Sequence, residues 1–330
     1  MKKISRPHRP NRTGAAAPGV FSRRLAGAAL AAALCVGSVG CGRADAKSSV
    51  PPQAASEAPA SSSGLAAQKL PTAQDVAAAS AASAVAPNSA AAPEAPTTVQ
   101  ITFAEGATVA RIADTLEENG VTDSASFFAQ VAETDLSAYP LAAEIPPSEG
   151  RCFRLEGYLF PDTYEFYVGE SAESVLHRML SNAEARISQT YRDRAAELGM
   201  SIDEAIILAS IIQKEAAPSQ MAEVSSVLHN RLRAGMRLQC DVTITYVEGA
   251  IKPYISGDVN RYNAQYNTYK CAALPAGAIC NPGLEALKAA LWPAESENLF
   301  FAFDAAGTYY YSKTYEEHRQ RCEAAGIRVG

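Results

Sequence analysis

The stretch SIDEAIILASIIQKEAAPSQ, residues 201–220, predicts a buried helix that ends on an acidic side chain. Ser201 and Glu204 have the spacing of a capping box, which starts helices. The following residues are apolar on nearly every side, as in helices buried inside a domain. Pro218 disfavours helical geometry at the residue before it, so the helix should end near Glu215. Spacings of three and four place that glutamate on one stripe with Leu208, Ile211 and Ile212.

Glu215 is therefore expected in an environment that disfavours its charged form. Burial disfavours a carboxylate, and so does the negative end of the helix dipole, by about 0.3–1 kcal/mol. Both effects predict a raised pKa. A carboxylic acid that stays protonated near neutral pH can serve as an acid catalyst. The sequence pattern equally allows a surface glutamate at a frayed helix end, paired with a lysine or arginine.

The chain has 330 residues and a net charge of −6, enough length for one large domain or two smaller ones. The acidic balance predicts no nucleic-acid partner.

Residues 1–42 have the pattern of an export signal. A basic run precedes an apolar stretch, residues 25–40, which is short for a membrane span and normal for a signal peptide. The stretch ends at Cys41 in a sequence like a lipoprotein cleavage box, although Ser38 stands where leucine is usual. Lipidation at Cys41 and an uncleaved membrane anchor both remain open. Either one would place the rest of the chain outside the cytoplasm.

Residues 43–96 are rich in alanine, serine and proline and contain no aromatic residue. Such a segment cannot bury a core, so it is predicted to be a disordered linker. As a flexible coil it would span about 40 Å, which suits a domain held away from a membrane.

The remaining sequence predicts an α+β fold, because strands and helices follow each other without a regular βαβ repeat. Residues 97–150 predict a small strand–helix–helix unit, with Thr108 and Ser124 as helix caps. Residues 151–330 predict an amphipathic helix near 175–187, the helix of Glu215 and a loop-rich region at 235–283. A β-hairpin around residues 299–312 follows, and Thr314 with Glu317 predicts a capping box for a last helix.

Five cysteines lie beyond the export segment, and none belongs to a CxxC motif or a Cys/His cluster. Their spacing therefore predicts no zinc site. Cys271 and Cys280 flank one loop and could form a disulfide, but small buried thiols would explain them as well. The full set is Cys152, Cys240, Cys271, Cys280 and Cys322.

Five stretches in series resemble the YceG-like (MltG) family of endolytic murein transglycosylases. They are LEGYLFPDTYEF, LASIIQKEA, VLHNRLRAGMRLQCDVTITY, YNTY and LPAGAICNPGLEALKAALWP. The resemblance covers about residues 99–321. It implies a membrane-anchored protein that faces outward, with a small LysM-like subdomain before a catalytic domain.

The resemblance also implies an activity, namely cleavage of the MurNAc–GlcNAc β-1,4 bond inside peptidoglycan strands to leave 1,6-anhydro-MurNAc ends. Glu215 matches the family's catalytic glutamate, and no metal or organic cofactor is implied. Contacts with cell-wall synthases are plausible for such a protein. The chain departs from the family pattern at four positions, namely Gln213, Cys240, Val242 and Ala276.

The resemblance points to YNTY as a substrate-binding stretch, because aromatic faces suit sugar rings and amide and hydroxyl groups suit sugar hydroxyls. A tyrosine-rich turn packed for stability is the alternative. A second group of polar residues would be explained about as well by a solvated face or structural ion pairs. The candidates are Tyr266, Asn267, Thr268 and Tyr269, then Asn230, Arg237, Gln239 and Asp241.

Three other functions stay open at this point. The protein could bind peptidoglycan without cleaving it, or serve as a scaffold for cell-wall synthesis. It could also be a hydrolase that uses Glu215 with a second carboxylate, for which Glu156, Asp162 and Asp241 are the candidates.

Overall fold

The computed structural model describes residues 96–328. The predicted export signal, the lipidation candidate Cys41 and the linker lie outside these residues. Across residues 96–328, no helix has the length and apolar character needed to cross a membrane. The described part is a mixed α and β structure with two small sheets, in agreement with the predicted fold class.

The first sheet joins two strands that are far apart in the sequence. Strand β1 (Thr98–Thr102) pairs antiparallel with β2 (Thr163–Tyr167). Three helices separate the two strands along the sequence, namely α1 (Val109–Glu118), α2 (Ser124–Glu133) and α3 (Pro140–Ala143). The predicted first strand and both helices are confirmed. The predicted cap of α2 is wrong by one residue, because the carboxylate of Asp123, not the Ser124 hydroxyl, accepts the Ser126 N–H at 2.9 Å.

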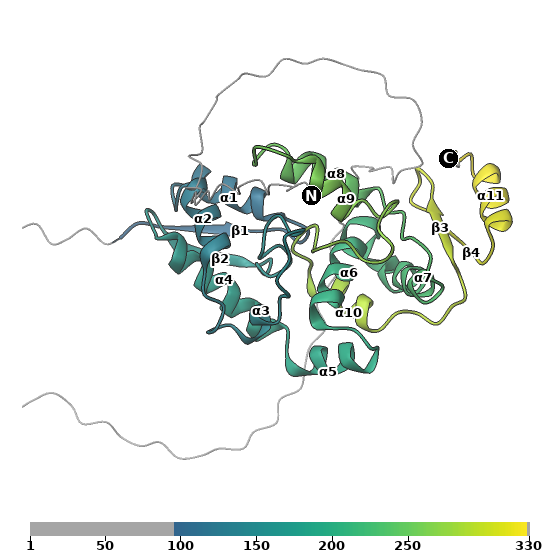
Figure 1. The fold of residues 1–330 in the computed structure, drawn as a ribbon, viewed down its shortest axis with the longest axis horizontal. Helices are drawn as coiled ribbons and strands as arrows, with labels where there is room; N and C mark the ends of the chain where they lie inside the picture. The colour runs from purple at the N-terminus through teal and green to yellow at the C-terminus, as the bar shows by residue number, and fades with distance from the viewer. Residues whose placement is uncertain (1–95, 329–330) are drawn as a thin grey trace, which may run out of the picture.

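The two strands of this sheet come from opposite sides of residue 150, where the sequence analysis placed a domain boundary. Helix α4 (Ala172–Arg186) also packs against α2, so the strand–helix–helix unit is completed by chain from beyond the boundary. We call β1 through α4 the N-terminal unit. Figure 1 shows it at one end of the molecule.

Helix α6 (Ile202–Glu215) is the centre of the second part of the fold. The capping box of Ser201 and Glu204 is formed as predicted, and Leu208 and Ile211 have no exposed surface. Three helices pack around α6, namely α5 (Gln189–Glu197), α7 (Met221–Arg233) and α10 (Leu284–Leu291). A short 3₁₀ turn (Pro218–Gln220) connects α6 to α7.

The region predicted as loops contains three short helical segments. These are α8 (Val242–Tyr246), a π-helical turn (Val247–Ile251) and α9 (Asn260–Tyr266). Five to seven residues are too few to show a helical period in the sequence, so this difference has a simple cause.

The C-terminal hairpin is confirmed, with β3 (Phe300–Phe303) paired to β4 (Tyr309–Ser312). Figure 1 shows it with α11 (Tyr315–Ala324) at the end of the molecule opposite the N-terminal unit. Thr314 caps α11 as predicted. The carboxylate of Glu317 accepts the N–H of Lys313 at 3.1 Å, one residue before the position that a capping box uses.

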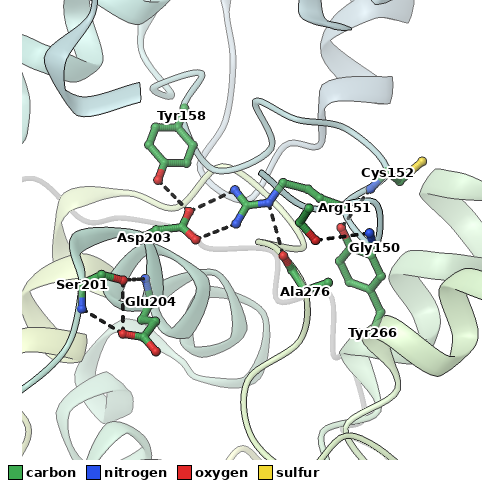
Figure 2. A network of polar contacts seen from close by, with 10 residues as sticks. Gly150, Arg151, Cys152, Tyr158, Ser201, Asp203, Glu204, Tyr266 and Ala276 are labelled. Carbon is green, nitrogen blue, oxygen red and sulfur yellow. Dashed lines mark hydrogen bonds and ion pairs between the residues drawn. The ribbon is translucent and has the colours of Figure 1, made fainter. Parts of the chain in front are cut away.

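A buried ion pair fixes the start of α6 (Figure 2). The Arg151 guanidinium donates two hydrogen bonds to the Asp203 carboxylate, at 3.0 and 2.6 Å, and the two side chains are only 2% and 4% exposed. The Tyr158 hydroxyl donates to the same carboxylate at 2.7 Å, and Arg151 Nε donates to the carbonyl of Ala276. The loop before β2, helix α6 and the loop near residue 276 are thereby held together.

A second buried polar cluster joins the N-terminal unit to the rest. Glu156 is fully buried and accepts hydrogen bonds from the Val109 N–H at 2.9 Å, the Tyr246 hydroxyl at 3.0 Å and the Asn281 amide at 3.1 Å. The side-chain oxygen of Asn281 in turn accepts hydrogen bonds from the N–H groups of Gly157 and Leu159. Burial raises the pKa of Glu156 to about 8.

Candidate functional site

Glu215 is the last residue of α6, and its side chain is buried, with the residue only 4% exposed. The prediction of a buried glutamate at the helix end is confirmed, and the alternative of an exposed residue at a frayed end is wrong. Ala216 is extended, with φ −120° and ψ 139°, which ends the helix two residues before Pro218. The predicted raised pKa of Glu215 stays a prediction.

The C-terminal hairpin contacts the segment that follows Glu215. The Tyr309 hydroxyl donates to the Glu215 carbonyl at 3.3 Å and accepts the Ala217 N–H at 3.0 Å. From the same strand, the Tyr311 hydroxyl donates to the Gln220 side chain at 2.9 Å. Sequence reasoning missed both tyrosines, because they lie about ninety residues from their partners and no local pattern marks them.

Two of the predicted binding residues, Tyr269 and Asp241, form a hydrogen-bonded pair near Glu215. The Tyr269 hydroxyl donates to the Asp241 carboxylate at 2.6 Å. Burial raises the pKa of Tyr269, and the hydrogen bond to Asp241 and the charges of Asp241 and Glu215 raise it further. Tyr269 thus interacts electrostatically with both Asp241 and Glu215. Tyr269 and Asp241 are both partly exposed, so solvent and ligands can reach the pair.

Tyr266 and Thr268 are not placed to bind substrate. Both are fully buried. The Tyr266 hydroxyl accepts the Cys152 N–H at 3.3 Å, and its ring packs against Tyr246. Thr268 bonds the backbone of Cys240, accepting its N–H at 2.8 Å. For these two residues the packed-turn alternative is the correct one.

Asn267 lies between them and is partly buried. Its side-chain oxygen accepts the Tyr269 N–H at 2.9 Å, so Asn267 shapes the turn that presents Tyr269.

Asn230 is also structural, contrary to the prediction. It is 9% exposed, and its amide donates to the carbonyls of Ser296 and Asn298 at 2.9 and 2.8 Å. The neighbouring Arg231 is buried and donates to the carbonyls of Leu299 and Leu238, at 2.6 and 2.7 Å. These bonds tie α7 to the hairpin and to the segment that precedes Asp241.

Arg237 and Gln239 are both exposed on the segment that leads to Asp241. Gln239 has a left-handed backbone, with φ 56°, which is uncommon for a residue with a side chain. Its N–H donates to the Thr268 carbonyl at 3.2 Å, which joins this segment to the turn that carries Tyr269.

Two of the three candidate second carboxylates lie away from this site. Glu156 is enclosed in the junction with the N-terminal unit. Asp162 binds Arg186 and Asn182 of α4, at 2.7 and 3.1 Å, which lowers its pKa. Asp241 is the one of the three that is hydrogen-bonded to Tyr269, whose pKa the charge of Glu215 raises.

Two of the four positions that depart from the family pattern make hydrogen bonds between different parts of the fold. Gln213 accepts the N–H of Gly283, the residue before α10, at 2.9 Å and so connects the end of α6 to the start of α10. The Ala276 carbonyl accepts a hydrogen bond from Arg151 Nε. The structure does not explain why valine stands at position 242.

The five cysteines of the described chain are all free thiols, so of the two alternatives left open for Cys271 and Cys280 the structure has the one without a disulfide. Cys280 is buried with its sulfur 3.3 Å from the Ser210 carbonyl, as expected of a small buried thiol, and burial raises its pKa. Within residues 96–328, no group of three or more His, Cys, Asp or Glu side chains could hold a metal ion.

Comparison with known proteins places this geometry in a family. Residues 73–324 match the model of the YceG-like family. The endolytic murein transglycosylase of Streptococcus pneumoniae D39 is 31% identical, over 68% of this chain and 44% of its own length. That of Bacillus subtilis 168 is 29% identical, over 68% of this chain and 64% of its own.

A crystal structure of a yceG-like protein from Listeria monocytogenes superposes with a TM-score of 0.58 at 32% identity, covering 67% of this chain and 75% of that one. This chain therefore spans between about two fifths and two thirds of the length of the curated relatives it matches. The match of the family model over most of the chain shows that this protein belongs to the YceG-like family.

Proposed function

We propose that this protein is an endolytic lytic transglycosylase that cleaves the MurNAc–GlcNAc β-1,4 bond within peptidoglycan strands. The names of the two curated relatives support this activity. The observation that carries the proposal is the burial of Glu215 at the end of α6, next to the hydrogen-bonded pair Tyr269–Asp241.

In this proposal Glu215 is the catalytic acid and base. Its protonated carboxyl donates to the glycosidic oxygen as the bond to C1 breaks. The C6 hydroxyl of the same MurNAc then attacks C1, and the Glu215 carboxylate takes the hydroxyl proton, which restores the acid. Because no water is activated, a second catalytic carboxylate is not needed, unlike in a hydrolase with two carboxylates.

Tyr269 and Asp241 would hold the sugar beside Glu215, with Arg237 and Gln239 at the edge of the site. The Tyr269 hydroxyl, whose pKa is ordinarily about 10 and is raised further here, is protonated at physiological pH and donates its hydrogen bond to Asp241. Asn267 acts indirectly, through the turn that presents Tyr269.

We also propose the placement that the N-terminal sequence favours. The segment before residue 97 anchors the protein to the bacterial cell membrane, by a span or by a lipid on Cys41, and the catalytic part faces outward. The N-terminal unit is the LysM-like subdomain of the family and binds glycan. Cell-wall synthases are candidate partners, and cleavage would limit the length of nascent strands.

Product analysis tests the activity. The full chain and its Glu215→Gln variant are incubated with purified peptidoglycan strands, and the products are identified by mass spectrometry. We expect anhydro-MurNAc ends from the wild type and a fall of at least about 10²–10⁴-fold in the variant. Glu295→Gln, which removes an exposed glutamate, is the matched control and should remain active. Intact strands from a folded, anchored wild type would favour a binding protein or a scaffold.

A hydrolase remains the second candidate, because Asp241 lies near Glu215 and could activate a water molecule. Reducing MurNAc ends in place of anhydro ends would identify it. Asp241→Asn would then abolish cleavage, whereas in a transglycosylase it should only weaken cleavage, through poorer binding of the sugar and poorer positioning of Tyr269.

A further inference from the structure

An open hollow between α5 and α10 combines aromatic rings, hydroxyls and an ammonium group. It is lined by Ser188, Thr190, Tyr191, Lys288 and Trp292. Trp292 is the single tryptophan of the chain, and it is 43% exposed. Tryptophan is highly buried on average, so an exposed indole in a hollow indicates a surface with a use.

The indole is held rigidly before any ligand arrives. The Tyr191 ring meets it edge-on, with centroids 5.8 Å apart and planes at 81°. The Arg194 guanidinium lies over the indole, 5.9 Å from the ring centroid. Arg194 Nε also donates to the Leu291 carbonyl at 3.0 Å, which ties α5 to the end of α10 beside Trp292. A fixed aromatic surface loses little conformational entropy when it binds.

The polar groups around the indole are available to a ligand. Ser188 precedes α5, but its side chain makes no capping hydrogen bond with the first turn. Lys288 is 50% exposed and pairs with Glu285 at 2.8 Å. An exposed pair of this kind contributes about 0–1 kcal/mol, so the ammonium group can exchange partners at little cost.

This combination matches the chemistry of a glycan. The C–H faces of a pyranose ring cover an aromatic ring, sugar hydroxyls bond serine and threonine, and the carboxylates of peptidoglycan stems attract an ammonium group. A stable protein–protein interface buries about 800 Å² on each partner, which is more than a hollow lined by five residues provides.

We infer that the hollow of Tyr191 and Trp292 is an accessory binding site for peptidoglycan glycan, apart from the site of cleavage. The identity of the polymer rests on the proposed function. Helix α10 starts beside Gln213, near the end of α6, and ends beside α5. The hollow is therefore about one length of this eight-residue helix, roughly 12 Å, from the end of α6 that carries Glu215, and it holds the polymer without touching the reacting bond.

The single tryptophan gives a direct binding test. The full chain carrying Glu215→Gln, which leaves the polymer intact, is titrated with soluble glycan strands while tryptophan emission is recorded. We expect a saturable change, because all indole emission comes from the hollow. Tyr191→Ala should raise Kd by about three- to tenfold. Tyr315→Ala removes a 52% exposed tyrosine on α11, outside the hollow, and should leave Kd unchanged.

Turnover gives the second test. In the otherwise wild-type enzyme, Trp292→Ala should raise KM for long strands by about three- to tenfold with kcat unchanged. Fragments too short to reach from Glu215 to the hollow should be cleaved at the wild-type rate. Trp292→Phe keeps an aromatic ring, so its KM should lie closer to the wild-type value than to that of Trp292→Ala. Circular dichroism melting of each variant separates loss of binding from loss of fold.

The outcomes distinguish this inference from the proposed activity. Strand binding without an emission change, or an unchanged Kd in Tyr191→Ala, would overturn the accessory site whether or not the enzyme is active. Saturable emission from a wild type that cleaves nothing would overturn the activity and support the site.

Discussion

The hydroxyl of Tyr309 fixes the end of the helix that carries Glu215. It donates to the Glu215 carbonyl and accepts the Ala217 N–H, so one side chain bonds backbone groups on both sides of the helix end. The last carbonyls of a helix have no partner within it, and here a strand ninety-four residues away supplies one. The orientation of Glu215 therefore depends on the C-terminal hairpin.

Tyr309→Phe should lower kcat by at least about tenfold, because small displacements of a catalytic group are costly. The free energy of unfolding should fall by only about 0.5–1.5 kcal/mol. Steady-state kinetics on glycan strands and urea unfolding measure the two effects. Tyr310→Phe is the control, because that hydroxyl bonds Asp304 within the hairpin. Equal activity in the two variants would show that Tyr309 does not position Glu215.

The two tyrosines of YNTY should respond oppositely to loss of their hydroxyls. Tyr266→Phe leaves the buried N–H of Cys152 without its acceptor, so stability should fall by about 1–3 kcal/mol with turnover retained below the melting temperature. Tyr269→Phe removes a donor beside Glu215, so turnover should fall with little change in stability. Melting temperature and turnover are measured for each variant. Reversed effects would mean that the structure assigns the two roles wrongly.

Glu156 should make stability depend on pH. Its folded pKa, about 8, lies above the ordinary glutamate value of 4.5, so the folded state holds the proton more tightly than the unfolded state does. The resulting stability is fully present below pH 4.5 and is lost as pH rises through about 8. The loss is on the order of 5 kcal/mol at most.

Urea unfolding of the wild type and Glu156→Gln at pH 5, 6.5 and 8 measures this dependence. The difference in stability between the two proteins should shift in favour of the variant as pH rises. Glu295→Gln, an exposed glutamate, serves as control. A difference that stays constant from pH 5 to 8 would contradict the raised pKa.

Breaking the buried pair Arg151–Asp203 should cost about 3–5 kcal/mol of stability, because one charge is left buried without its partner. Asp203→Asn tests this by urea unfolding. The pair Lys313–Glu297, at 2.6 Å, is exposed on both sides, so Lys313→Met should cost less than about 1 kcal/mol. Similar losses in both variants would mean that Arg151 and Asp203 are accessible to water in solution.

Features with a local cause were predictable from the sequence. Three such features act within a few residues of one another: the capping box at Ser201, the apolar period of α6 and the break before Pro218. Together they predicted that Glu215 lies in a buried last turn of the helix. The hairpin at residues 300–312 was predictable for the same reason. The resemblance to a family added the chemistry that these patterns leave open.

Features with a distant cause were not predictable. Tyr266 and Tyr269 are three residues apart in one motif, yet one is a core residue and the other is partly exposed, because Tyr266 is the last residue of α9 and Tyr269 lies in the turn after it. The partners described above for Asn230, Arg151 and Glu156 lie 47 to 125 residues away, where periodicity carries no information. The cap at Asp123 was missed because Ser124 is an equally good capping residue by type.

The pairing of β1 with β2 sets an order for folding during synthesis. Thr98 pairs with Tyr167, so the chain up to Tyr167 must leave the ribosome before the sheet can close completely. Helices α1 and α2 form from local contacts, but the surface they cover is incomplete until β2 and α4 follow. A chain truncated near residue 150 should therefore expose the edge of β1 and aggregate, whereas one that extends beyond Arg186 can bury it.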